Sequence, residues 1–427
     1  MTKFSIVSGW IARFRKSTLL QRIGALMTGT VIAQAIQLFN LVILAKLYPL
    51  SDVGTYSMFF AIASTLAPAA MLGYEMLIPA VPDDEIRPYL KAIGLLPLPM
   101  ALLAAAAAFL AGYGHWAAIA SWISGAAIQR LGEMYNVRRN RFRHVASARL
   151  LQALLMSGVL AGFILSQRRD IDEMIAVQAS LVFVLGVSYA AFSLPLSELA
   201  ESCSWAAMAK TLRNAANAPL FLLPSNFLNL IAYNVPVVVI GKWFGADLAA
   251  QYAYVLRFGF GPVSLIGGTL YQVFYGLLTE AVRSQNEALF NQFARARRMI
   301  FFAAVSATLG IALSYPIGFR LLLGPQWMTA GWISLIFAPF FGAMIYLTPL
   351  SVALNTFNRQ YFELKTQLHY LIISALSFGI AIALHNSWIG FMLFSWLGCL
   401  RYALLLKDIN AILIESEVIA DGNRKAP

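Results

Sequence analysis

Long apolar stretches alternate with short polar ones along most of the chain. Twelve of the apolar stretches reach about 20 residues, the length that an α-helix needs to cross the hydrocarbon core of a bilayer. The pattern therefore predicts an all-α integral membrane protein with twelve transmembrane helices. The predicted spans are residues 23–47, 54–80, 91–112, 116–135, 145–166, 174–196, 219–242, 249–279, 299–320, 327–354, 366–385 and 388–406.

Composition agrees with this reading. Of the 427 residues, 60% are hydrophobic and 12% are charged, whereas a soluble domain has about 25% charged residues. The first span is too long for the core of a signal peptide, and no A-x-A site follows it, so we expect it to stay as an anchor. Two cysteines, Cys203 and Cys399, are too few for a disulfide framework. The chain is therefore expected to be a polytopic membrane protein.

The distribution of the net charge of +12 predicts the orientation of the helices. With the N-terminus in the cytoplasm, nearly all Lys and Arg residues fall in cytoplasmic tails, loops and helix ends, as the positive-inside rule requires. Both termini are then cytoplasmic. Two basic clusters, RRNRFRH (138–144) and RARR (295–298), are explained by this rule, as residues that stay in the cytoplasm and contact anionic lipids. A sharper hypothesis is that they attract a phosphorylated lipid headgroup at the inner leaflet. No nucleic-acid role is expected, because no soluble domain presents the charge. The basic residues expected on the outer side are Lys46, Arg168, Arg169, Lys242 and Arg320.

A weak internal repeat predicts how the helices are grouped. AKLYPLSDVGTYSMFF (45–60) parallels GKWFGADLAAQYAYVL (241–256), which aligns Lys46 with Lys242 and Tyr56 with Tyr252. The two segments join predicted helices 1 and 2 and predicted helices 7 and 8. We therefore expect two six-helix lobes related by a pseudo-twofold axis along the membrane normal, with a substrate path between them. The expected parts are a cytoplasmic interfacial segment (1–22), an N-lobe with helices 1–6 (23–200), a C-lobe with helices 7–12 (201–407) and a short, loose cytoplasmic tail (408–427).

Polar side chains form one stripe on each of two repeat-equivalent helices. Such stripes avoid lipid, so they either hydrogen-bond to other helices or line a hydrophilic cavity. Their matched positions favour a shared cavity. The stripe residues are Thr30, Gln34 and Gln37 in the first helix and Asn226, Asn229 and Tyr233 in the seventh.

A few further residues are unusual for their places in apolar spans. Arg257 is the only basic residue predicted to lie deep inside a span, and such a guanidinium either satisfies loosened backbone carbonyls or binds an anion. Lys46 and Lys242 would be accessory charges at the outer rim, or they snorkel. Glu75 is a second intramembrane candidate, either functional or interfacial. Glycine and proline close to Arg257 predict a hinge, against the alternative of static packing; the hinge residues are Gly259, Gly261 and Pro262.

Four segments resemble bacterial polysaccharide flippases, the O-antigen and exopolysaccharide branch of the multidrug/oligosaccharidyl-lipid/polysaccharide exporter superfamily. They are KLYPLSDVGTYSMFFAIASTLAPAAMLGYEMLIPAVPDD (46–84), NRFRHVASARLLQ (140–152), FLLPSNFLNLIAYNVPVVVIGKWFGADLAAQYAYVLRFGFGPVSLIGGTLYQVFY (221–275) and LLLGPQWMTAGW (321–332). The resemblance implies alternating access in the bacterial inner membrane. It also implies a substrate, an oligosaccharide repeat unit on undecaprenyl pyrophosphate that moves from the inner to the outer leaflet for O-antigen, exopolysaccharide or capsule synthesis.

The resemblance further implies membrane lipids, a polysaccharide polymerase and chain-length machinery as partners. It implies no cofactor, and it leaves open a coupling ion, H⁺ or Na⁺. Arginine would hold the pyrophosphate. Tyrosines would stack on sugars or, as the alternative, pack in the core; the candidates are Tyr233, Tyr252, Tyr254 and Tyr271.

Two other functions remain as alternatives. Drug/cation antiporters resemble this fold but commonly carry a carboxylate in helix 1 or helix 7, and neither 23–47 nor 219–242 contains Asp or Glu. Polysaccharide polymerases and ligases use the same lipid-linked substrate but need a large extracytoplasmic loop, and the longest candidate, SQRRDIDEM (166–174), is short. Neither a metal-ligand cluster nor a nucleophile motif is evident. A transporter rather than an enzyme is therefore expected.

Overall fold

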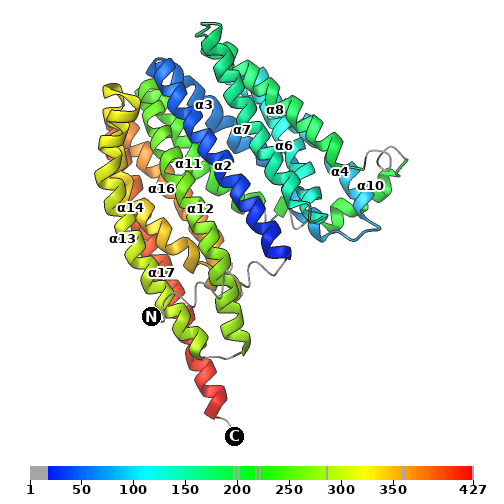
Figure 1. Cartoon of the computed structure of the whole chain (residues 1–427), viewed down its shortest axis with the longest axis vertical. Coiled ribbons are helices and arrows are strands. Elements are labelled where there is room, and N and C mark those ends of the chain that lie inside the picture. The colour runs from blue at the N-terminus through cyan, green and yellow to red at the C-terminus, as the bar shows by residue number, and fades with distance from the viewer. Residues whose placement is uncertain are drawn as a thin grey trace. The chain divides into compact units, whose positions relative to one another are not determined.

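The protein is described by a computed structural model that covers residues 18–195, 199, 202–216, 219–220, 223–284, 287–357, 359 and 361–425. These residues form helices and short connections (Figure 1), which confirms the all-α prediction. The expected interfacial segment 1–22 lies largely outside them, and the side chain of Asn226 is also not described.

The chain divides into two compact units. The first holds Met1–Tyr48 and Phe59–Phe227, and the second holds Pro49–Met58 and Leu228–Pro427. A ten-residue piece of the N-terminal half therefore belongs to the unit otherwise built from the C-terminal half. The α-helices up to residue 214 are α2 (Thr18–Leu47), α3 (Leu50–Leu66), α4 (Ile86–Gly94), α5 (Pro97–Leu110), α6 (Trp116–Arg138), α7 (Phe142–Leu165), α8 (Ile171–Ser193) and α10 (Trp205–Asn214). Those that follow are α11 (Leu223–Phe244), α12 (Ala246–Ser284), α13 (Glu287–Leu323), α14 (Met328–Leu350), α15 (Val352–Thr356), α16 (Tyr361–Ala383) and α17 (Ser387–Lys425).

Ten helical segments among the described residues are long and apolar enough to cross a membrane, so the protein is a multi-pass membrane protein. The helices α6 and α12, which correspond to the predicted spans 116–135 and 249–279, are not among the ten. Within α6 the charged residues Arg130 and Glu133 lower the apolar character. Length and hydropathy thus identify ten candidate membrane spans among the described residues, whereas the sequence analysis predicted twelve.

Three predicted elements differ from the observed ones. The span 54–80 is not one α-helix: α3 ends at Leu66 and two 3₁₀ segments, Ala67–Met71 and Tyr74–Ala80, follow. Between them Leu72 has a φ of 54° and Gly73 a φ of 77°, which breaks the helical path. The span 91–112 is divided between α4 and α5. The expected loose tail 408–427 instead continues α17 to Lys425.

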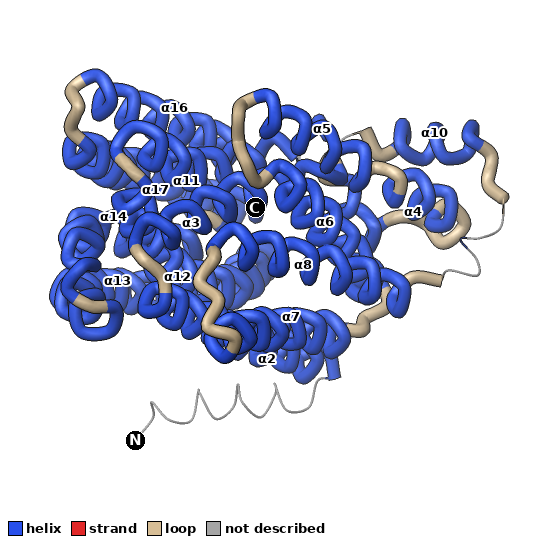
Figure 2. The backbone as a smooth tube through the Cα atoms, turned by 90° about the horizontal axis from the view of Figure 1, so that it is seen from above, coloured by secondary structure: helices blue, strands red, loops and turns tan. Residues whose placement is uncertain are grey.

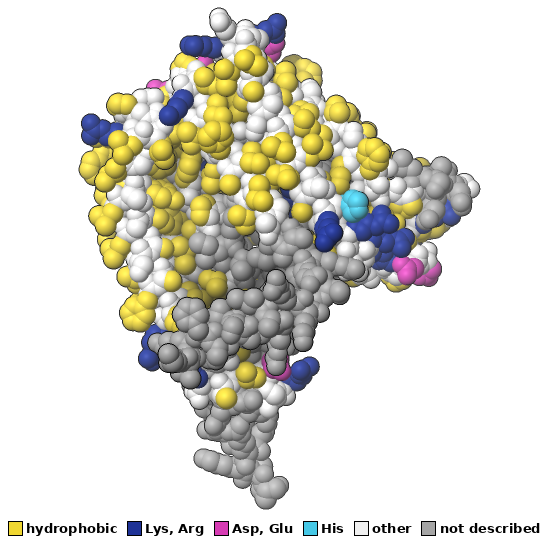
Figure 3. All heavy atoms as spheres, in the orientation of Figure 1, with side chains coloured by type: hydrophobic (Ala, Val, Ile, Leu, Met, Phe, Trp, Pro, Cys, Tyr) yellow, Lys and Arg dark blue, Asp and Glu magenta, His cyan; other side chains and the backbone are white. Residues whose placement is uncertain are grey.

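The exterior is apolar, as a lipid-facing surface must be. Hydrophobic side chains cover much of the face seen in Figure 3. Leu110 and Phe192 are 84% and 91% exposed. In water such side chains would favour aggregation, whereas lipid tails solvate them.

Two helix pairs organise the first unit: α2 lies beside α7, and α6 beside α8 (Figure 2). The second pair is very close at two glycines. A Cβ on Gly125 would lie 2.4 Å from the Cα of Phe183, and one on Gly186 would lie 2.1 Å from the carbonyl oxygen of Gly125. Small residues thus allow the two backbones to touch.

Substitution Gly125→Ala is expected to destabilise the first unit by roughly 1–3 kcal/mol, because backbone atoms cannot yield to the added methyl. Thermal unfolding of the detergent-purified protein measures the change. Gly158→Ala is the matched control, since no atom lies within 4 Å of a Cβ built there. Equal melting temperatures for the two variants would contradict the close α6–α8 contact.

Aromatic side chains form the core of the second unit. Phe337, Phe340 and Phe341 of α14 are fully buried. The rings of Phe337 and Phe340 contact Phe394 of α17, and the ring of Phe341 contacts Phe260 of α12. Tyr252 of α12 stacks on Phe391 with ring centres 5.4 Å apart. This core fixes α12 and, with it, the part of the helix that carries Arg257.

Candidate functional site

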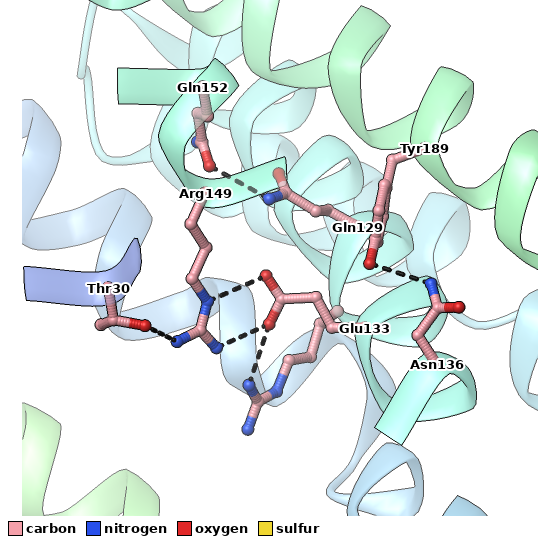
Figure 4. A network of polar contacts seen from close by, with 8 residues as sticks. Thr30, Gln129, Glu133, Asn136, Arg149, Gln152 and Tyr189 are labelled. Carbon is pink, nitrogen blue, oxygen red and sulfur yellow. Dashed lines mark hydrogen bonds and ion pairs between the residues drawn. The ribbon is translucent and has the colours of Figure 1, made fainter. Parts of the chain in front are cut away.

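A polar face on α6 is the centre of the main polar network of the first unit. Gln129, Glu133 and Asn136 are spaced i, i+4 and i+7, so they project from one side of the helix. All three are at least 93% buried. Figure 4 shows them directed toward polar partners on α7 and α8, with α2 nearby.

Arg149 of α7 binds Glu133 through two hydrogen bonds. Its Nε donates to Oε1 at 3.3 Å and its Nη2 donates to Oε2 at 2.9 Å. This bidentate geometry is the strongest form of guanidinium–carboxylate contact. Nη1 donates to Oγ1 of Thr30 at 3.3 Å, which links α2 to the pair (Figure 4).

Glu133 serves a second arginine as well. Arg130 donates from Nη1 to Glu133 Oε2 at 3.3 Å, and 40% of its side chain is exposed. Glu133 itself is only 7% exposed, and Arg149 is 32% exposed. Two guanidinium groups therefore share one buried carboxylate, and both keep part of their surface accessible. This arrangement can attract an anion.

Neutral hydrogen bonds extend the network. Gln129 donates to Gln152 Oε1 at 3.1 Å. Asn136 donates to the Tyr189 hydroxyl at 2.9 Å (Figure 4). It also donates to Ser193 Oγ at 2.8 Å, so both bonds join α6 to α8. These contacts satisfy polar groups that would each destabilise the protein by several kcal/mol if left unpaired in lipid.

The predicted stripe on α2 is only partly drawn into this network. Thr30 accepts from Arg149, as described. Gln34 is half-buried and Gln37 is exposed. Asn40, one turn further along, was not among the predicted residues; it accepts from Ser157 Oγ at 2.8 Å.

Glu75 lies in the 3₁₀ segment Tyr74–Ala80 and is 5% exposed. Its Oε2 has no hydrogen-bond partner among the described residues. Arg130 is the cation that attracts it electrostatically. Glu75 therefore lies in the same unit as the polar face of α6 and interacts electrostatically with its Arg130. Among the described residues it forms no direct ion pair with that face.

Arg257 lies in the second unit, on α12, next to Tyr56 of α3. Its guanidinium carbon is 5.7 Å from the centre of the Tyr56 ring, within the range of a cation–π contact. Tyr56 belongs to the ten-residue piece Pro49–Met58. On the same piece, Gly54 is so close to Ala246 that a Cβ would lie 2.0 Å from its carbonyl oxygen. The first turns of α3 therefore pack against α12 and place the Tyr56 ring beside the Arg257 guanidinium.

Lys46 and Lys242 occupy equivalent places in the two hairpins. Each is exposed and lies in the last turn of its helix, α2 or α11. An acidic residue begins the next helix in both cases, Asp52 in α3 and Asp247 in α12, where it suits the positive end of the helix dipole. Lys242 also lies over the Trp243 ring at 4.9 Å. Both lysines can reach an aqueous boundary.

The predicted polar residues of α11 are partnered within the second unit. Asn229 donates to Gln367 Oε1 at 2.8 Å. Tyr233 lies among aromatic rings, the nearest being Phe260 at 4.5 Å. Both are therefore held in place by neighbouring helices.

The tyrosines weighed as sugar platforms divide into two groups. Tyr252 and Tyr254 are completely buried, and Tyr254 packs against Trp327 with ring centres 4.3 Å apart. The ring faces of these two tyrosines are therefore covered by other core side chains. Tyr271 is half-buried, accepts from Asn355 at 2.5 Å and stacks on Tyr275.

The proposed hinge residues lie inside a continuous helix. α12 runs unbroken from Ala246 to Ser284 with Pro262 in its interior. Gly259 has a packing role, because a Cβ there would lie 2.2 Å from the ring of Phe341. Gly261 and Pro262 are half-buried. A hinge at Gly259–Pro262 remains a prediction.

The sequence reasoning missed Glu133 and Arg149. Arg149 was included only among the basic residues of the cytoplasmic helix ends, near the cluster 138–144, and Glu133 was not considered. The i, i+4, i+7 spacing of Gln129, Glu133 and Asn136 was the available signal. Among the described residues no three His, Cys, Asp or Glu side chains gather as a metal site would need.

Several solved structures that are similar in fold to this chain are membrane transporters. The lipid II flippase MurJ in an inward closed conformation has a TM-score of 0.67 at 14% identity, with 92% of this chain and 91% of that chain covered. An inward-facing multidrug resistance MATE family transporter of the MOP superfamily has a TM-score of 0.64 at 14% identity, covering 93% and 99%. A Vibrio cholerae MATE transporter has a TM-score of 0.53 at 15% identity, covering 92% and 98%. No family model and no curated protein matches the sequence.

Proposed function

We propose that this protein is a flippase that moves an undecaprenyl-pyrophosphate-linked oligosaccharide repeat unit from the inner to the outer leaflet by alternating access. The observation that carries the proposal is the pair Arg130 and Arg149, two partly accessible guanidinium groups on one buried carboxylate. A pyrophosphate needs several donors of this kind, and guanidinium groups bind phosphate oxygens bidentately.

The negative charge of the pyrophosphate carrier gives a reason for an arginine to be present within an apolar transmembrane helix. A buried arginine costs on the order of 3 kcal/mol by insertion scales. An anionic headgroup that enters a water-filled path would offset this cost when it binds. Arg257, over the Tyr56 ring, is the second candidate contact for the phosphates or for an acidic sugar. Lys46 and Lys242, both exposed at helix ends, are candidate outer-rim charges.

Fold similarity leaves two classes of cargo, because the neighbours include a lipid II flippase and multidrug transporters. Cationic drugs need an anionic site. The segments 23–47 and 219–242 contain neither Asp nor Glu, while the accessible charges of the first-unit network are arginines. The partly accessible groups of this network, two guanidinium groups, therefore favour an anionic, lipid-linked cargo.

Reconstitution into proteoliposomes tests the proposal. With a lipid-linked oligosaccharide labelled on its sugar, we expect the full-length protein to expose the label to an impermeant quencher added outside. Protein-free liposomes and liposomes with the Arg149→Ala variant should keep the inner-leaflet label protected. Efflux of ethidium without any movement of the lipid-linked sugar would identify a drug transporter and overturn the proposal.

A further inference from the structure

A cleft of about 530 Å³ opens among α13, α14 and α17 in the second unit. Its polar residues include Arg297, Arg298, Tyr346 and Asn410. It is separate from the polar network of the first unit and from Arg257, neither of which contributes to its lining. The function proposed above leaves this cleft unused.

Arg297 is preorganised by two neutral partners. Its Nε donates to the Tyr346 hydroxyl at 3.1 Å and its Nη2 donates to Asn410 Oδ1 at 2.6 Å. Neither partner carries a negative charge. No carboxylate among the described residues forms an ion pair with Arg297 or with the exposed Arg298. The cleft thus presents two positive charges, one of them in a fixed orientation.

The cleft lies where two spans end. Arg297 and Arg298 directly precede Met299, at which α13 becomes continuously apolar. Asn410 follows the apolar part of α17, after Lys407 and Asp408. The hydrogen bond from Arg297 to Asn410 shows that both ends lie at the same level. This level corresponds to a membrane boundary, where phospholipid phosphates lie.

The remaining lining is apolar and aromatic. Phe290 and Phe293 lie on one side of the arginines along α13, Phe301 lies on the other, and Leu413 of α17 completes the wall. A soluble anion would gain nothing from these side chains. A phospholipid would place its phosphate on the guanidinium groups and its glycerol and upper acyl carbons against the rings.

We propose that this cleft binds the headgroup of an anionic phospholipid. Arg297 and Arg298 hold the phosphate, Tyr346 and Asn410 orient Arg297, and the phenylalanines contact the lipid backbone. Bound in this way, the lipid ties α13 to α14 and α17 at one membrane face. The site is independent of the transported cargo.

Native mass spectrometry of the full-length protein, titrated in neutral detergent with phosphatidylglycerol or phosphatidylcholine, tests the site. We expect phosphatidylglycerol to bind at least about tenfold more tightly, and Arg297→Ala/Arg298→Ala to weaken it about 20-fold. Arg295→Ala is the matched control, because Arg295 is on the same helix but does not line the cleft. Its effect should stay below about threefold. Equal affinity for the two lipids, or equal effects of the variants, would overturn the proposal.

Wild-type protein gives a second measurement that does not depend on how the variants fold. A photoreactive phosphatidylglycerol should crosslink to peptides that contain residues 290–301 and 410–413. Crosslinks elsewhere in the chain alone would refute the site. Millimolar inorganic pyrophosphate should leave the crosslinks unchanged; if it removes them, the cleft binds soluble anions instead of lipid.

Discussion

Glu133→Ala is expected to destabilise the first unit by about 3 kcal/mol, because it leaves Arg149 half-buried without its carboxylate and removes an acceptor from Arg130. We expect the destabilisation to come mainly from the positive charge of Arg149, which loses its counter-charge, and less from the loss of the Glu133 contacts themselves. The double variant Glu133→Ala/Arg149→Ala should therefore be more stable than Glu133→Ala alone. Thermal unfolding in detergent measures both.

An exposed ion pair in the same unit supplies the control. Glu173 pairs with Arg168, and their side chains are 39% and 63% exposed. Water screens such a pair, so Glu173→Ala should change stability by less than about 1 kcal/mol. If Glu133→Ala and Glu173→Ala behave alike, Glu133 is not the buried counter-charge described here.

Arg257→Ala is expected to reduce surface-glycan export at least tenfold in a cell whose glycan depends on this protein. One charge-assisted hydrogen bond to a phosphate contributes about 1.5–3 kcal/mol, which corresponds to a factor of ten or more. Arg257→Lys should restore little, because lysine keeps the charge but loses the bidentate fork. Glycan at the cell surface, normalised to protein level, is the measurement.

Arg320→Ala serves as the matched control, since Arg320 is an exposed arginine in the last turn of α13. Export should remain near the wild-type level in this variant. Normal export by Arg257→Ala would remove Arg257 from the mechanism, and full rescue by lysine would indicate a simple point charge.

The sequence predicted the helices well because span length is set by the bilayer and can be counted. It could not show where the second predicted helix stops being an α-helix. The α-helix ends at Leu66, and the chain turns again at Leu72, a residue type that seldom adopts a positive φ. The local signals in the sequence were Pro68, at the start of the first 3₁₀ segment, and Gly73, between the two segments.

The site was less predictable because polar residues look alike in sequence whether they line a path or join helices. Thr30 was expected on a polar face and does bind Arg149. Tyr252 and Tyr254, weighed as sugar platforms, turned out to be fully buried. Glu133 escaped notice because charge near a basic loop is usually interfacial, and only the three-dimensional pairing with Arg149 distinguishes it.

The short piece Pro49–Met58 has a consequence for how the molecule can be divided. It belongs to the second unit, although it lies far upstream in the chain and supplies Tyr56 beside Arg257. A polypeptide cut between Phe227 and Leu228 would give a C-terminal fragment without these ten residues. If the two halves were expressed separately, the C-terminal half would lack Pro49–Met58, which the N-terminal half would carry. No single cut in the chain therefore separates the two units.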